Sequence, residues 1–176
     1  MTGRVVALGL CLPGRQVESV TVERLELWTE GIVGDRHFGP TLVAGPRQKH
    51  VRKGTVLPNT RQVSLVSREE NAAIAEALKL ASFDFTWLAA NVELEGVPSL
   101  TSLPPHSRLV FEGGVTLIVD GENEPCRKVG RVIAEHSGAK VESTFVRAAA
   151  GRRGLVAFVG APGTLRVGEF VRVEPR

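Results

Sequence analysis

Apolar and polar residues alternate over short stretches of this chain, and a period of two is typical of β-strands with one buried face. Residues 4–12 and 16–28 predict a first pair of strands joined by a turn at residues 13–14. In the second stretch the alternation changes phase at residues 23–24, so the apolar side chains before and after that point fall on opposite faces. The phase change predicts a bulge or bend of the kind that strands rounding a barrel often need.

Further alternating stretches are separated by segments with helical apolar spacing. They predict strands at residues 61–66, 91–95, 108–112, 115–120, 154–159 and 168–173. Helices are expected near residues 67–81, 86–90, 126–138 and 141–150. Ser67 and Glu70 have the spacing of a capping box, and Gly113-Gly114 fits a two-residue primed turn between strands. Since strands dominate and no βαβ alternation is sustained, we predict a mainly β fold with inserted helices (α+β), arranged as a closed or partly open, mostly antiparallel β-barrel.

The length and composition fit a single domain over residues 1–176 with a substantial core. The two cysteines are too few for a disulfide framework, which favours reduced thiols in a reducing compartment. The N-terminus lacks a signal-peptide pattern, and no stretch reaches the roughly 20 apolar residues needed to span a bilayer. We therefore expect a soluble cytoplasmic protein that makes no membrane contact.

Residues 29–60 show no periodicity, and a connection this long is usually functional or disordered. The overlapping stretch 31–62 is basic, because it contains six Lys and Arg residues against one acid. Those cations are Arg36, Arg47, Lys49, Arg52, Lys53 and Arg61. A positive segment punctuated by Gly and Pro suggests an anionic partner, although a solvated loop explains the charge equally well.

Cys126 is the sharpest candidate for chemistry. It follows Pro125, which suits the first turn of a helix, so the thiol is expected near unpaired backbone N–H groups at the positive end of that helix. Arg127 and Lys128 add positive charge, and together these features favour a thiolate, which can ligate a soft metal or carry a persulfide. The alternative is a buried core cysteine, because Cys126 shares the apolar face of its helix. Cys11, in an apolar strand, is expected to belong to the core only.

A glycine-rich run at residues 31–39 is a second candidate. Within it lie Gly34, Asp35, Arg36 and His37. Glycine allows close backbone approach to a ligand, and the three residues after it supply charge and hydrogen-bonding groups. A tight turn with solvated charges explains the same pattern nearly as well.

Three polar residues at strand starts complete the set. Arg61 could bind a phosphate or carboxylate through two hydrogen bonds, or could pair with a surface acid. Gln62 follows it directly, and Asn91 precedes a strand as either a turn residue or an amide in a cofactor pocket. None of these positions is specific by itself.

Taken in order along the chain, several stretches resemble the MOSC domain, a family named after the C-terminal part of molybdenum cofactor sulfurase. They are GIVGDRHFG at 31–39, RQVSLVSREE at 61–70, AANVELEGV at 89–97, LPPHSRLVFEGGVTLIVDGENEPC at 103–126 and RRGLVAFVGAPGTLRVGEFVRV at 152–173. The set covers most of the chain, with a Pro-Cys after a hairpin and an Arg-Gly near the last strands. The resemblance implies a β-barrel-like fold and implies that Cys126 is the functional cysteine of the family.

In molybdenum-containing relatives, including amidoxime-reducing enzymes, that cysteine ligates molybdenum, so the resemblance implies the molybdenum cofactor (molybdopterin) as a ligand. The anionic cofactor would be held by residues that match the family's motifs and by the basic residues described above. These are Gly34, Asp35, Arg36, His37, Lys49, Arg52, Arg61, Gln62, Asn91, Arg127 and Arg153. The family is also associated with pyridoxal phosphate binding.

Three functions stay open from the sequence. The first is a molybdenum-cofactor oxidoreductase that reduces small N-oxygenated compounds and takes electrons from a separate reductase. The second is a carrier of persulfide sulfur for cofactor or metal–sulfur cluster assembly, supplied by a cysteine desulfurase. The third is a non-catalytic module for anions or nucleic acid, although the basic stretch has one aromatic residue, Phe38, and lacks the stacking pattern of single-strand binders.

Overall fold

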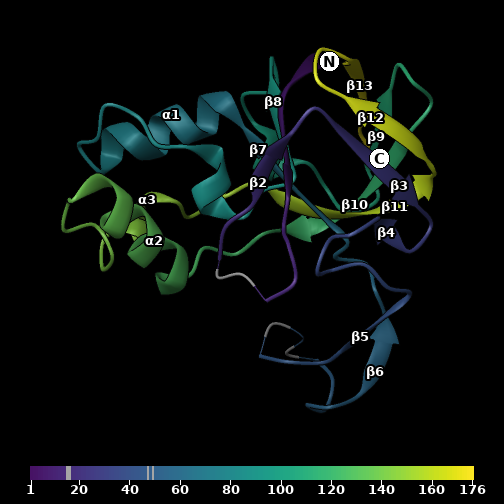
Figure 1. The fold of residues 1–176 in the computed structure, drawn as a ribbon, viewed down its shortest axis with the longest axis horizontal. Coiled ribbons are helices and arrows are strands. Elements are labelled where there is room, and N and C mark those ends of the chain that lie inside the picture. The colour runs from purple at the N-terminus through teal and green to yellow at the C-terminus, as the bar shows by residue number, and fades with distance from the viewer. Residues whose placement is uncertain (15–16, 47, 49) are drawn as a thin grey trace.

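A closed β-barrel forms the centre of the structure (Figure 1). The computed structural model describes residues 1–14, 17–46, 48 and 50–176. Within these residues seven strands pair in the order β13-β9-β10-β11-β7-β8-β1, and β1 pairs with β13 to close the barrel. They are β1 (Thr2–Leu10), β7 (Val63–Ser67), β8 (Val92–Glu95), β9 (Arg108–Phe111), β10 (Thr116–Glu122), β11 (Leu155–Ala161) and β13 (Phe170–Glu174). Among them only β7 and β8 run parallel, so the predicted mostly antiparallel barrel is confirmed.

Alternating burial explains why these segments form the barrel. In β9, for example, Leu109 and Phe111 are buried while Arg108 is exposed. The interior is filled by Leu, Val and Phe side chains from every barrel strand, including Leu65, Leu94 and Leu117. Each fully buried side chain of this size contributes about 1.5–3 kcal/mol, so the barrel is a rigid support for the loops around it.

The predicted change of phase at residues 23–24 is confirmed as a change of sheet. Strand β2 (Val20–Val22) pairs with β1, whereas β3 (Arg24–Trp28) pairs with β12 (Gly163–Arg166) and β4 (Gly31–Ile32) in a separate three-stranded sheet. The sequence pattern does not predict β12, which begins at Gly163 directly after Pro162, where the residue types favour a turn.

The long aperiodic segment contains a two-stranded hairpin. Its strands are β5 (Thr41–Val43) and β6 (Val56–Pro58), which pair antiparallel. This hairpin, called the arm (residues 41–58) below, extends away from the barrel (Figure 1). Strands of three residues are too short to give a hydrophobic period, which explains why the sequence predicted a loop here.

The helices α1 (Arg68–Ala77), α2 (Arg127–Ser137) and α3 (Phe145–Ala148) gather on one side of the barrel (Figure 1). Together with the 3₁₀ segment η1 (Phe85–Leu88) they share a second apolar cluster. The 3₁₀ segment η2 (Leu100–Ser102) instead contributes Leu100 to the core of the barrel. Each predicted helix is present, although α1 and α3 are shorter than expected. No helix in the described ranges is long and apolar enough to cross a membrane.

Two local predictions are only half right. Ser67 caps α1 by accepting a hydrogen bond from the backbone N–H of Glu70, but the Glu70 carboxylate binds Thr101 instead of closing a capping box. At the β9–β10 turn Gly114 has a positive φ of 91°, whereas Gly113 does not. A two-residue primed turn centred on Gly113 and Gly114 would need a positive φ at Gly113. The backbone N–H of Gly114 instead donates to the carbonyl of Phe111 in a tight turn.

Candidate functional site

Two adjoining cavities open beside the start of α2. The larger has a volume of about 700 Å³ and the smaller about 330 Å³. The residues that line both cavities are Arg36, His37, Arg61, Cys126 and Lys128. The cysteine singled out by the sequence and two cations of the basic stretch 31–62 therefore meet at one place, although 90 residues separate Arg36 from Cys126 in the chain.

Cys126 is the residue immediately before α2. Its backbone is extended, with φ −138° and ψ 156°, and its side chain makes no capping hydrogen bond to the helix. The sequence placed this residue inside the first helical turn, but the helix begins one residue later. The side chain is half-buried, because it packs against the apolar cluster under the helices while also lining both cavities. Both interpretations of the sequence thus describe part of its environment.

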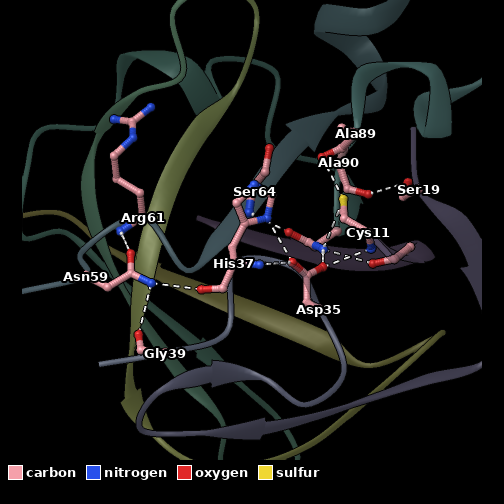
Figure 2. Close-up of polar contacts among 12 residues, drawn as sticks. Cys11, Ser19, Asp35, His37, Gly39, Asn59, Arg61, Ser64, Ala89 and Ala90 are labelled. Carbon is pink, nitrogen blue, oxygen red and sulfur yellow. Dashed lines mark hydrogen bonds and ion pairs between the residues drawn. The ribbon is translucent and has the colours of Figure 1, made fainter. Parts of the chain in front are cut away.

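Asp35 is a buried carboxylate at the centre of a hydrogen-bond network (Figure 2). Its Oδ2 accepts from the backbone N–H of Cys11 and from Asn91 Nδ2, each at 2.9 Å. Its Oδ1 accepts from the backbone N–H and Nδ1 of His37, each at 2.8 Å. Burial acts to raise the pKa of this carboxyl, but the hydrogen bonds from His37 and Cys11 outweigh it and hold the pKa below its ordinary value. An ionised Asp35 therefore fixes the orientation of the His37 ring, with Nδ1 donating.

Cys11, Asp35 and His37 offer ligand atoms within 4.8 Å of one another, which is close enough to consider a metal ion. The hydrogen bonds argue against that use. Both Asp35 oxygens already accept two hydrogen bonds each, and Cys11 Sγ lies 3.5 Å from the Ala89 carbonyl, to which it donates. Burial, followed by the charge of Asp35, raises the pKa of the Cys11 thiol to about 12. The group is better described as a brace that joins three chain segments, and Cys11 is a core residue as predicted.

Gln62 and Asn91 have amides that the fold already uses. Gln62 donates from Nε2 to the Thr29 carbonyl at 3.0 Å, and its Oε1 accepts from the Val159 N–H at 2.9 Å. Asn91 donates to Asp35 and to the Gly9 carbonyl, and its Oδ1 accepts from the Ser64 N–H at 3.0 Å. Both residues line the smaller cavity, but their polar atoms hold strands together.

Arg61 and Arg153 carry positive charge at the smaller cavity. Arg61 lies 3.7 Å from Asp120, the kind of surface pairing that the sequence left open, and it also lines both cavities. In Figure 2 its guanidinium extends away from the Asp35 network. Arg153 is buried and donates to the carbonyl of Leu88.

The other expected residues lie at different depths. Gly34 has φ +81°, which allows the tight turn that brings Asp35 back toward the barrel. Arg127 lines the larger cavity, is mostly exposed and lies 3.8 Å from Glu142. Arg52 is exposed on the arm and lines neither cavity. Lys49 lies outside the described residues.

Several lining residues escaped the prediction. Lys128 was noticed only as a neighbour of Cys126, yet it lines both cavities. The larger cavity also has an apolar wall, formed by Phe38, Leu42, Val43 and Pro46. Apolar residues inside an aperiodic, basic stretch were the available signal for this wall.

Comparisons with known proteins agree with this architecture. The family model described as MOSC domain matches residues 33–172. A curated relative from Bacillus subtilis (strain 168), "Putative metal-sulfur cluster biosynthesis proteins YuaD", is 41% identical over 155 residues, which cover 87% of this chain and 81% of the relative.

Solved structures show the same fold. The crystal structure of the YuaD protein from Bacillus subtilis superposes with a TM-score of 0.95 at 38% identity, covering 100% of this chain and 97% of that one. YiiM from Geobacillus stearothermophilus gives a TM-score of 0.68 at 13% identity, with 97% of this chain and 74% of that chain covered. YiiM from Escherichia coli gives 0.60 at 16% identity, with 98% and 70% covered. The likeness to the two YiiM structures concerns the fold alone.

Proposed function

From the premise that this chain belongs to the MOSC domain family, we propose that it binds the molybdenum cofactor beside Cys126 and reduces small N-oxygenated compounds. The observation that carries the proposal is that the half-buried thiol of Cys126, which makes no capping hydrogen bond to α2, lies with Arg36, Arg61 and Lys128 at the junction of two cavities.

The side chains at this junction fit such a cofactor chemically. A cysteine sulfur is a soft ligand of the kind that binds molybdenum–sulfur centres, and Cys126 Sγ is not used by the helix it precedes. The pterin part of the cofactor carries a phosphate, and Arg side chains bind phosphate through paired, charge-assisted hydrogen bonds. Arg36, Arg61 and Arg153 line the smaller cavity and are the residues that would hold the anion.

Residues beside Cys126 would shape the space that a substrate enters. Asp35 keeps Nδ1 of His37 protonated, so its Nε2 points away from the buried carboxylate, and the His37 ring lines both cavities. The arm supplies Leu42, Val43 and Pro46 to the lining of the larger cavity, where they would offer an apolar surface to a bound substrate. The larger cavity is therefore the side from which a small organic substrate would approach.

The bound cofactor would supply two electrons to the substrate. The reaction breaks the N–O bond of a hydroxylamine, R–NHOH, which takes up two electrons and two protons and yields R–NH₂ and water. The electrons require a separate reductase as donor, because the sequence shows no flavin or iron–sulfur motif.

Metal and pterin analysis tests the proposal. The protein is purified from cells that make the cofactor, as wild type, Cys126→Ser and Cys11→Ser. Cys11 is the matched control because it is buried and lines neither cavity. We expect molybdenum and pterin in the wild type and the control, with molybdenum lost from Cys126→Ser. Equal molybdenum in all three proteins, or none in any of them, contradicts the proposal.

A second candidate is a persulfide sulfur carrier. The uncapped position of Cys126 favours it, because the free backbone N–H groups at the start of α2 could stabilise a terminal persulfide anion. The transfer would be an exchange in which the Cys126 thiolate takes the outer sulfur of a desulfurase persulfide and the desulfurase cysteine leaves as a thiolate. The printed name of the YuaD relative also points to metal–sulfur cluster biosynthesis. Mass spectrometry after incubation with a cysteine desulfurase and cysteine would show an adduct of one sulfur on Cys126, and the absence of that adduct rules out this candidate.

A further inference from the structure

The lining of the larger cavity contains two chemically different sets of side chains. Four are cationic, namely Arg36, Arg61, Arg127 and Lys128. Four are apolar, namely Phe38, Leu42, Val43 and Pro46. A ligand that fills this cavity must satisfy both sets at once.

No carboxylate offsets the cations from within the cavity. Among the described residues that line it, the uncharged polar ones are Thr41, Gln48 and Asn59, and none is an Asp or Glu. Arg61 and Arg127 have acids at 3.7 and 3.8 Å, but those acids do not line the cavity. The field inside is therefore positive and favours an anionic group on the ligand.

The apolar part of the lining includes the aromatic ring of Phe38, which packs against a second aromatic ring. Phe38 packs edge-to-face against Trp28, with ring centroids 6.1 Å apart and an interplanar angle of 68°. This contact restrains the Phe38 ring, which lines the cavity while remaining 39% exposed. A restrained, accessible ring favours an aromatic or other flat apolar group on the ligand.

We propose that the substrates of this site are N-oxygenated compounds that combine an aromatic or similarly apolar body with a carboxylate. The inference rests on the proposed function for the reaction and adds the class of substrate. The apolar body lies on Phe38 and the arm, and the carboxylate lies against Lys128 and the neighbouring guanidinium groups. Neutral N-oxygenated compounds of the same size are poorer ligands, because they gain nothing from the positive field inside the cavity.

Binding of two matched probes tests the inference without any cofactor chemistry. Naphthalene-2-carboxylate and naphthalene-2-methanol have the same aromatic body, and only the first carries charge. Calorimetric titration of the purified protein, and of Cys126→Ser, should show the carboxylate binding at least about tenfold more tightly, which corresponds to about 1.4 kcal/mol. The preference should shrink as salt is added.

Three variants locate the two contacts. Lys128→Gln should weaken the carboxylate probe several-fold and leave the alcohol unchanged. Phe38→Ala should weaken both probes by about fivefold. Lys140→Gln removes an exposed cation that does not line this cavity, and both probes should bind it as they bind the wild type.

Equal affinity for the two probes overturns the inference, as does a charge preference that Lys140→Gln reduces as much as Lys128→Gln. These outcomes are independent of the proposed function, since probe binding is measured in protein with and without Cys126. Molybdenum content that does not depend on Cys126 would instead refute the proposed function while leaving the probe preference intact.

Discussion

Replacing Asp35 with Asn should destabilise the protein far more than its small change in shape suggests. The carboxylate accepts four hydrogen bonds, two on each oxygen, from Cys11, Asn91 and His37. An amide keeps one oxygen but turns the other into an NH₂ group that faces two donors. Two hydrogen bonds to a charged acceptor are lost, either from the buried donors of Cys11 and Asn91 or from the part-buried donors of His37.

The magnitude follows from those two losses. Hydrogen bonds to charged groups contribute about 1.5–3 kcal/mol each, so we expect Asp35→Asn to lower the free energy of unfolding by about 3–6 kcal/mol. For a chain of 176 residues this corresponds to a fall in Tm of roughly 10 °C. Thermal and urea unfolding followed by circular dichroism would measure both quantities.

Asp120→Asn is the matched control. Asp120 is partly exposed and lies 3.7 Å from Arg61, so its pairing is screened by solvent and should contribute less than about 1 kcal/mol. If the Asp35 variant unfolds within about 0.5 kcal/mol of the wild type, or no lower than the Asp120 variant, then the carboxylate does not brace the site as described here.

Three further results are expected. Burial raises the pKa of Glu70 from 4.5 to about 7 in the folded protein. The protonated side chain therefore contributes about 3 kcal/mol of stability below pH 4.5, and this contribution is lost as the pH rises toward and through 7. The free energy of unfolding of Glu70→Gln, measured from pH 5 to 8, should lack that decline, and an unchanged decline contradicts the prediction. A neutral alkylating reagent should label Cys126 in the native protein and label Cys11 only after unfolding, because Cys126 lines the cavities and Cys11 is buried. Mass spectrometry of the digested protein would identify the labelled cysteine, and labelling of Cys11 before Cys126 would contradict this prediction. Gly154→Ala should prevent stable folding, because its Cβ would lie 2.0 Å from a backbone carbonyl oxygen of β7. Gly114 also has a positive φ, but a Cβ at this position would meet no atom within 4 Å, so Gly114→Ala should lower the free energy of unfolding by only about 1–2 kcal/mol. Equal melting temperatures for the two variants would contradict this prediction.

The sequence predicted the barrel well because local patterns dominate its strands. Alternation located every barrel strand, and the phase change at residues 23–24 predicted a bulge or bend at the point where the structure shows the chain passing from one sheet to another. Strands β5 and β6 escaped because three residues do not define a period. Strand β12 is as long as β8 and β9, but it begins at Gly163 directly after Pro162, where the residue types favour a turn.

The location of the site could be predicted from the sequence, but the roles of its individual residues could not. A Pro-Cys before a helix and a basic, glycine-rich segment drew attention to Cys126 and to residues 31–39, and the structure brings both to the same cavities. The role of Asp35 depends on partners 24 and 56 residues away, Cys11 and Asn91, and no local pattern carries such distances. From the sequence, Asn91 could be either a turn residue or an amide in a cofactor pocket. In the structure it lines the smaller cavity, and its amide joins the strands that frame the site.

X-ray absorption at the molybdenum edge tests the central claim most directly, because it counts the sulfur atoms around the metal. Wild-type protein isolated with its cofactor should show one more sulfur neighbour than free cofactor, and the Cys11→Ser protein should show the same count. The Cys126→Ser protein should retain little or no molybdenum, and any metal that it retains should lack that one sulfur. An identical sulfur count in wild type and Cys126→Ser, with molybdenum present in both, would contradict the account.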